Sequence, residues 1–202
     1  FSPMKKTGVP AMNEREKKYY FISDLHIGGD AALDSCDFEV ELLAFLRNLE
    51  KEEGEAELVI VGDLFGFWEM SGPEGVEKLE KVVKSHRELF EQCKQTGETI
   101  SITVIPGNHD YHLACDSELK DYLGRYNIIL EPREHIIRRL GDKKIWIEHG
   151  SQRDPMNRAR KFGDPYVTPF GYFVTSHITA TAGRYSDYGR GDWLKEVESI
   201  QP

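Results

Sequence analysis

Polar side chains that can hold metal ions follow four apolar stretches of the chain. The four motifs are Asp24-x-His26, Gly62-Asp63, Gly107-Asn108-His109-Asp110 and His149-Gly150. Carboxylate, imidazole and amide oxygen, without a thiolate, form a ligand set suited to manganese, iron(II), zinc or magnesium. Each motif alone also suits an ordinary turn, because Gly, Asn and Asp are common in turns. Their shared position after apolar runs favours a metal site.

This ligand set is large enough for two divalent ions. In a binuclear site a carboxylate bridges ions about 3.5–4 Å apart, and a hydroxide held between them can attack phosphorus. We predict that Asp63 is the bridging carboxylate. Gly62 precedes Asp63 and Gly107 precedes Asn108, and glycine lets the backbone approach the ions without a side-chain clash.

Apolar strands are expected directly before the first three motifs, at residues 19–22, 58–61 and 100–105. Apolar residues at helical spacing predict helices over residues 38–49, 76–93 and 119–126. The second of these helices is expected to begin with a capping box at Ser71-Gly72-Pro73-Glu74. Further strands are predicted at residues 128–130, 135–140 and 144–147, the last of which runs into His149. This alternation predicts an α/β sheet, whose carboxyl edge is the usual place for ligands.

The composition indicates one soluble globular domain, with 39% hydrophobic and 30% charged residues. No run approaches the roughly 20 apolar residues of a membrane span, and the first residues lack the apolar segment of a signal peptide. We therefore expect a cytoplasmic protein. The three cysteines show no CxxC spacing, which argues against a disulfide framework or a thiolate zinc site. A net charge of −9 disfavours nucleic acid as a partner.

The domain organisation predicted from the sequence has three parts. Residues 1–18 are expected to form a flexible arm, residues 19–202 one domain, and residues 151–190 a lid-like insertion within it. The insertion holds six basic against three acidic side chains, a local charge of +3. Arg153, Arg158 and Arg160 are expected to contact substrate, since arginine holds phosphate oxygens bidentately. The aromatic residues of the insertion would pack on the substrate or fill a small core of their own. A helix is predicted over residues 192–200.

The order of the motifs resembles the calcineurin-like metallophosphoesterase superfamily, whose pattern is D-x-H, G-D, G-N-H-D/E, H and then G-H-x-H. The resemblance implies a two-sheet β-sandwich core flanked by helices, in the layer order α/β/β/α. It implies hydrolysis of a small-molecule phosphate mono- or diester with two divalent ions, manganese first among the candidates. Asp24 and His26 would hold the first ion, Asn108 and His149 the second, and Asp63 both. His109 would contact the phosphate and assist the leaving group, and Asp110 would orient the site.

A closer resemblance is to the UDP-2,3-diacylglucosamine pyrophosphohydrolase branch. It rests on the strings Ser23-Asp24-Leu25-His26 and Gly62-Asp63-Leu64-Phe65-Gly66-Phe67-Trp68. Two positions depart from that branch, because Gly66 stands where an acidic residue is usual and His109 where an arginine is usual. These departures argue against a lipid-nucleotide substrate. Replacing His109 by Ala is expected to lower turnover by roughly 10²–10⁴-fold, at the low end of that range because Gly66 removes the usual acidic neighbour.

The fifth block of the family pattern, G-H-x-H, does not occur in the chain. The nearest string is Ser176-His177-Ile178-Thr179. Either the chain is cut before that block or the site is degenerate; we expect the cut, which would leave this chain a poor enzyme. The alternative functions are a non-catalytic scaffold of the same fold that binds protein partners, and a nuclease of the superfamily.

Overall fold

The structure is a computed structural model that describes residues 17–30, 34 and 36–179. Most of the predicted arm, the end of the predicted insertion and the predicted helix over residues 192–200 lie outside the described residues. The elements in chain order are β1 (Lys18–Ile22), α1 (Glu39–Leu49), β2 (Ala56–Val61), η2 (Phe67–Glu69), α2 (Val76–Ser85), α3 (Arg87–Thr96), β3 (Ser101–Ile105), η3 (Tyr111–Ala114), α4 (Ser117–Gly124), β4 (Ile128–Leu130), β5 (His135–Leu140), β6 (Lys143–Glu148), η4 (Ser151–Arg153), α5 (Phe170–Phe173) and η5 (Val174–Thr179).

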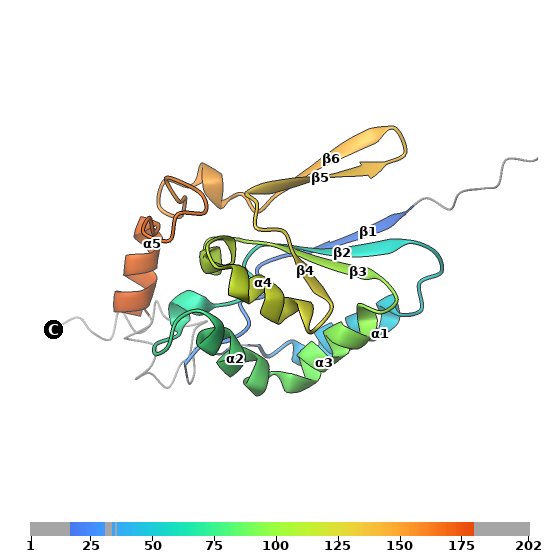
Figure 1. Cartoon of the computed structure of the whole chain (residues 1–202), viewed down its shortest axis with the longest axis horizontal. Helices are drawn as coiled ribbons and strands as arrows, with labels where there is room; N and C mark the ends of the chain where they lie inside the picture. Colours follow the sequence, from blue (N-terminus) through green and yellow to red (C-terminus); the bar gives the residue numbers. More distant parts are fainter. Residues whose placement is uncertain (1–16, 31–33, 35, 180–202) are drawn as a thin grey trace, which may run out of the picture.

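Four parallel strands form the main sheet in the order β1-β2-β3-β4. The strand order follows the chain order, and each pair of neighbours is connected through helices. Right-handed crossovers that advance in one direction place every connecting helix on the same face of a sheet. Figure 1 shows this arrangement, with α1, α2, α3 and α4 on one side of the sheet. The strand predictions in this region are confirmed to within two residues at each end.

The other face of the main sheet packs against an antiparallel hairpin formed by β5 and β6. Val59 and Ile105 of the main sheet contact Ile136 and Ile147 of the hairpin, and all four are buried. A much larger apolar cluster lies between the main sheet and the helices. β2 lies between these two clusters, which explains its nearly continuous apolar sequence.

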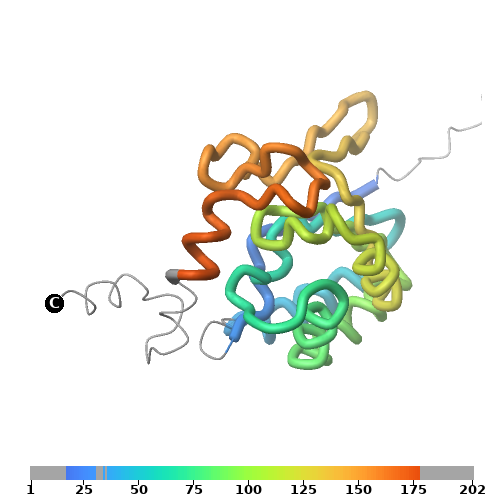
Figure 2. Tube along the Cα trace, turned by 60° about the vertical axis from the view of Figure 1, so that its left-hand side comes forward, coloured from blue at the N-terminus to red at the C-terminus, as the bar shows by residue number. Residues whose placement is uncertain are grey.

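The layers of the described residues are therefore helices, parallel sheet and antiparallel hairpin. Figure 2 shows the hairpin and the orange to red segment together on the side opposite α1 and α3. The mixed α/β class is confirmed by these layers. The second helical layer of the predicted α/β/β/α order is not seen among the described residues. Trp146 and Ile137 of the hairpin are exposed, so no described helix covers them. No helix in the described part of the chain is long and apolar enough to cross a membrane.

The prediction of one continuous helix over residues 76–93 is wrong, because the chain breaks at His86 into α2 and α3. His86 has non-helical backbone angles, and its two ring nitrogens lie 2.9 Å from Glu39 and 3.0 Å from Asp34. The apolar period continues across the break because both helices turn an apolar face to the same sheet. A periodicity argument therefore cannot detect the break.

The predicted capping box is also wrong. Ser71 lies outside the helix, where its backbone N–H and hydroxyl donate to Asp30. Glu74 instead accepts a bond from Lys78 at 2.8 Å. Gly75, with a φ of 64°, directly precedes α2. A left-handed residue is easiest for glycine, so the helix begins one turn later than the motif indicates.

Candidate metal centre

The loops after β1 and β2 continue side by side beyond the sheet. Backbone hydrogen bonds join Asp24 to Gly62 (3.2 Å) and His26 to Asp63 (2.9 Å). Asp24, His26 and Asp63 all have a positive φ, of 55°, 47° and 52°. Non-glycine residues adopt this conformation infrequently, and its strain concentrates at functional sites. The two loops are thus held in a shape that presents these three side chains at the carboxyl edge of the sheet.

Asp63 lies at the centre of the group. Its carboxylate is buried, and its Oδ1 accepts a hydrogen bond from the backbone N–H of His109 at 2.8 Å. The other oxygen, Oδ2, lies 3.7 Å from Nε2 of His26 and 3.3 Å from Nε2 of His149. Donor atoms from the β1 loop and from the end of β6 therefore approach the same carboxylate oxygen.

The remaining predicted ligands, Asp24 and Asn108, lie close to this group. Donor atoms of Asp24, Asp63 and His149 all lie within 4.8 Å of one another. Oδ1 of Asn108 is 3.1 Å from Nε2 of His149. The structure thus brings together all five residues expected to hold metal, although they come from four separate segments.

His149 is oriented by the strand that precedes Asp63. Its Nδ1 lies 2.9 Å from the carbonyl oxygen of Val61. A carbonyl oxygen only accepts, so Nδ1 carries the proton and Nε2 is the nitrogen that faces the cluster. Such a second contact commonly orients a histidine ligand of a metal.

Two glycines make the close approach possible. A Cβ at Gly62 would lie 2.8 Å from Cβ of His149, and the φ of Gly62 is +79°. A Cβ at Gly107 would lie 2.5 Å from the backbone nitrogen of Asp63 and 2.8 Å from its Cγ. These separations leave no room for a side chain at position 62 or 107. They agree with the expectation that glycine at both positions lets the backbone come close to the ligand residues.

The electrostatics of the cluster favour an ionised carboxylate at its centre. Burial raises the pKa of Asp63, but the hydrogen bond from His149 and the charges of three neighbouring histidines bring it below the usual value. Burial lowers the pKa of His149, yet the hydrogen bond and the charge of Asp63 raise it to about 9. A buried carboxylate balanced by imidazoles is a site where a divalent ion can replace the imidazole protons.

Asp110 holds the motif loops in place rather than facing the cluster. It is completely buried and accepts hydrogen bonds from the backbone N–H groups of Gly107 (2.7 Å) and Phe65 (3.2 Å). Burial and the nearby charge of Asp63 raise the pKa of Asp110 to about 7. Its contacts tie the third motif to the loop after Asp63.

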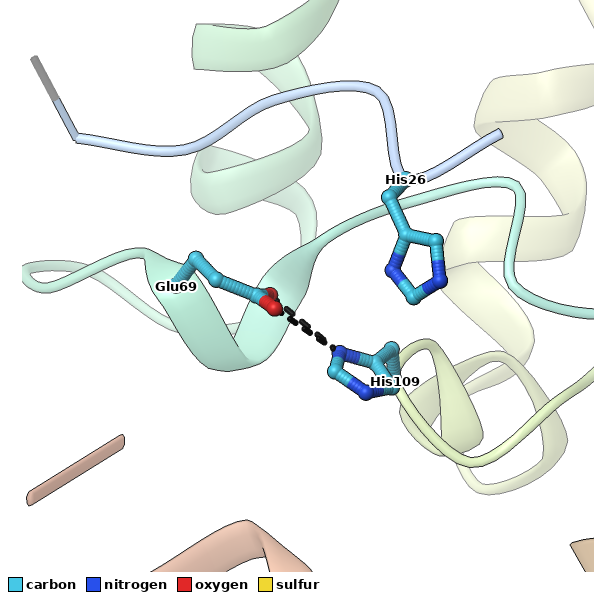
Figure 3. Close-up of side chains that lie close together, drawn as sticks. All are labelled: His26, Glu69 and His109. Carbon is cyan, nitrogen blue, oxygen red and sulfur yellow. Dashed lines mark hydrogen bonds and ion pairs between the residues drawn. The ribbon is translucent and has the colours of Figure 1, made fainter. Parts of the chain in front are cut away.

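Glu69 was missed by the sequence reasoning, although the structure places it beside His109. It ends η2, only 3% exposed, and its two carboxylate oxygens lie 3.1 and 3.3 Å from Nδ1 of His109. Figure 3 shows the pair together with His26, whose donor atoms lie within 4.8 Å of those of Glu69 and His109. The signal in the sequence was a single acidic residue in the otherwise apolar run from Leu64 to Met70.

Another group of possible metal donors lies away from these motifs. Cys36, Glu39 and His86 have donor atoms within 4.8 Å of one another. Burial, together with the charge of Glu39 and other nearby carboxylates, raises the pKa of the Cys36 thiol to about 12, which disfavours the thiolate. Both nitrogens of His86 already contact carboxylates, so this group serves to join the start of α1 to the α2–α3 junction.

The described part of the predicted insertion packs against the motif loops. The hydroxyl of Tyr111 donates to the carbonyl oxygen of Lys161 at 2.8 Å and accepts from the N–H of Asp164 at 3.0 Å. The ring of Tyr172 meets that of Trp68 edge-on, with centroids 5.9 Å apart. Figure 1 shows α5 beyond the same end of the sheet as these loops.

The three predicted substrate arginines occupy two different environments. Arg153 is exposed, with 81% of its side chain accessible, and lies 3.6 Å from Glu148. Arg158 and Arg160 line a cavity of about 510 Å³ together with the aromatic residues Tyr166, Phe170 and Phe173. The structure therefore separates Arg153 from the other two.

His177 does not join the cluster among the described residues. It is exposed, and its ring contacts Tyr172 and Phe173. Its Nδ1 lies 2.8 Å from the hydroxyl of Ser176. These contacts give no support to His177 as a substitute for the missing G-H-x-H ligands.

A family model described as calcineurin-like phosphoesterase matches residues 17–196, which include all four motifs. No curated protein matches the chain significantly.

Proposed function

Because the chain belongs to the calcineurin-like phosphoesterase family, we propose that it hydrolyses a phosphate mono- or diester at a site that holds two divalent ions. The family match confirms the superfamily predicted from the motifs. The closer resemblance to the UDP-2,3-diacylglucosamine pyrophosphohydrolase branch and the cytoplasmic location stay predictions. The substrate is therefore stated only as a small-molecule phosphoester.

The observation that carries this proposal is the buried carboxylate of Asp63, whose Oδ2 lies 3.7 Å from Nε2 of His26 and 3.3 Å from Nε2 of His149. Asp24 and His26 come from the loop after β1, Asn108 follows β3 and His149 follows β6; Oδ1 of Asn108 lies 3.1 Å from Nε2 of His149. Oxygen and nitrogen donors of this kind fit manganese, iron, zinc or magnesium. We favour manganese and assign the first pair to one ion and the second pair to the other.

The ions would stabilise charge that develops at phosphorus and lower the pKa of a water molecule for attack. His109 is proposed to contact the phosphate and to give a proton to the leaving group. Its Nδ1 contacts Glu69, so the opposite nitrogen, Nε2, is the one available to the substrate. Asp110 holds the turn that carries His109 through its bonds to Gly107 and Phe65.

The cavity next to α5 is proposed as part of the substrate wall. Arg158 and Arg160 supply positive charge for a second anionic group, and Phe170 and Phe173 supply apolar surface. Replacing both arginines by Ala should raise the KM of the true substrate more than that of bis(p-nitrophenyl) phosphate. Equal effects on both substrates would remove this role, and Arg153, nearer His149 in the chain, would be tested next.

A metal reconstitution experiment tests the proposed function. The protein is stripped with a chelator and titrated with manganese, while bound metal and hydrolysis of bis(p-nitrophenyl) phosphate are followed. Asp63→Asn should bind metal at least about 10–100-fold more weakly and lose activity. Asp142→Asn, at an exposed position in the β5–β6 turn, is the matched control and should behave as wild type.

The same experiment separates the alternatives. Metal binding without hydrolysis of any phosphoester would favour a non-catalytic scaffold, and cleavage of single-stranded nucleic acid in preference to small esters would favour a nuclease. Unchanged metal binding by Asp63→Asn would refute the assigned centre.

A further inference from the structure

Glu69 is a buried carboxyl side chain in an otherwise apolar stretch of the chain. Its side chain is 4% exposed, and its neighbours in sequence, Trp68 and Met70, are buried apolar residues. Burial of a carboxylate is unfavourable unless charge or hydrogen bonds compensate it. The contact with His109 provides such compensation, so the position of Glu69 is tied to that ring.

The ring of His109 is held on three sides. Glu69 meets Nδ1 through both carboxylate oxygens, at 3.1 and 3.3 Å. The indole of Trp68 stacks on one face, with ring centroids 4.1 Å apart and planes inclined by 25°. The ring of His26 meets it edge-on, with centroids 4.5 Å apart. Figure 3 shows that Glu69 and His26 approach His109 from different segments, η2 and the loop after β1.

These contacts determine which ring nitrogen faces outward. An ionised carboxylate only accepts hydrogen bonds, so Nδ1 must carry a proton in this arrangement. Nε2 of His109 has no hydrogen bond to any described residue. The ring is therefore set with Nε2 available to a bound ligand, in an orientation that the chain itself maintains.

Packing around Gly66 explains why the carboxylate comes from position 69. A Cβ at Gly66 would lie 2.8 Å from the carbonyl oxygen of Gly28 and 3.2 Å from that of His26, both rigid backbone atoms. The same Cβ would lie 3.1 Å from Oε2 of Glu69. The β1 loop thus excludes a side chain at position 66, and the turn of η2 brings the carboxylate of Glu69 into the adjacent space.

We propose that Glu69 is a positioning residue that orients His109 toward the leaving group of the phosphoester. This inference rests on the function proposed above. The contact also corrects the expectation that Gly66 leaves His109 without an acidic neighbour. Glu69 acts through His109 and does not itself contact the substrate.

The central test replaces the acceptor with an apolar side chain of similar length. Glu69→Met should lower kcat about 10–100-fold, as loss of an orienting partner typically does, with KM and bound manganese unchanged. The loss should be larger for an alkyl phosphoester than for a p-nitrophenyl ester, because only the poor leaving group needs a proton donor. Glu69→Gln keeps an acceptor oxygen and should recover most of the activity.

One further measurement and a control variant make the outcome unambiguous. Ring ¹⁵N NMR of the metal-free protein should show His109 protonated at Nδ1 in wild type and a mixture of tautomers in Glu69→Met; if Glu69→Met does not fold, Glu69→Ala takes its place in the same comparison. Glu74→Gln, an exposed acidic residue, is the matched control and should leave both readouts unchanged.

Three results would overturn the inference. Loss of manganese from Glu69→Met would make Glu69 a ligand, together with His26 and His109. Wild-type kcat in Glu69→Met, or equal losses for both leaving groups, would remove the positioning role alone. Absence of metal-dependent hydrolysis in the wild-type protein would instead remove the proposed function, and the role of Glu69 with it.

Discussion

Replacing Gly107 by Ala is the most direct test of the geometry around Asp63. The added Cβ would lie 2.5 Å from the backbone nitrogen of Asp63, whereas real Cβ contacts below 3.0 Å essentially never occur. The difference means that the two residues must separate by at least about 0.5 Å, and the carboxylate of Asp63 must move too. Overpacking of this kind costs about 1–3 kcal/mol, which corresponds to a fall in Tm of roughly 2–12 °C for a domain of this size.

The effect on the site should exceed the effect on stability. The N–H groups of Gly107 and His109 bind Asp110 and Asp63 at 2.7 and 2.8 Å, so a shift of residue 107 disturbs both carboxylates. We expect manganese affinity to fall about 10–100-fold and turnover by up to about 100-fold, the usual consequence of misplacing a site by an ångström.

Calorimetric titration of manganese, hydrolysis of bis(p-nitrophenyl) phosphate and thermal unfolding measure these effects. Gly124→Ala is the matched control, since nothing lies within 4 Å of its added Cβ. If Gly107→Ala binds manganese and turns over as wild type does, Asp63 is not held against Gly107 and the proposed centre is wrong.

Two further predictions concern stability. Arg138→Met should destabilise the protein by about 2–4 kcal/mol at pH 7 in urea unfolding, because the buried carboxylate of Glu57 loses bonds of 2.8–3.1 Å to the guanidinium. Burial raises the pKa of Glu57, but the hydrogen bond from Arg138 and the other hydrogen bonds to Glu57 lower it below the usual value. The stability that the Glu57 carboxylate contributes is therefore fully present at neutral pH. This stability is lost as the pH falls below about 4.3, the pKa of an unfolded glutamate, and through the lower pKa of the folded protein. An equal destabilisation at pH 3 would contradict this explanation. His86→Ala removes the contacts to Glu39 and Asp34 and should lower the free energy of unfolding by about 1–3 kcal/mol with metal binding intact; lost metal binding at wild-type stability would show that His86 belongs to a metal site.

Local pattern was sufficient to predict the elements that carry the motifs. The strands before Asp24, Asp63 and Asn108 are recognisable because buried parallel strands need continuous apolar residues, and a polar motif must then follow where the strand meets solvent. The grouping of the first three motifs followed from the same rule, since parallel strands end at one edge of a sheet, whereas His149 follows a strand of the separate hairpin. These inferences depend only on neighbours along the chain.

The break at His86 and the role of Glu69 depended instead on residues far away in sequence. His86 ends a helix because carboxylates from the start of α1 and the loop before it meet its ring. Glu69 is 40 positions from His109, and its importance follows from the space that the β1 loop denies to Gly66. Hydrophobic period and motif order therefore determined at which strand ends the site residues lie. Steric exclusion between separate loops decided which carboxylate orients His109, because only the folded chain brings those atoms into contact.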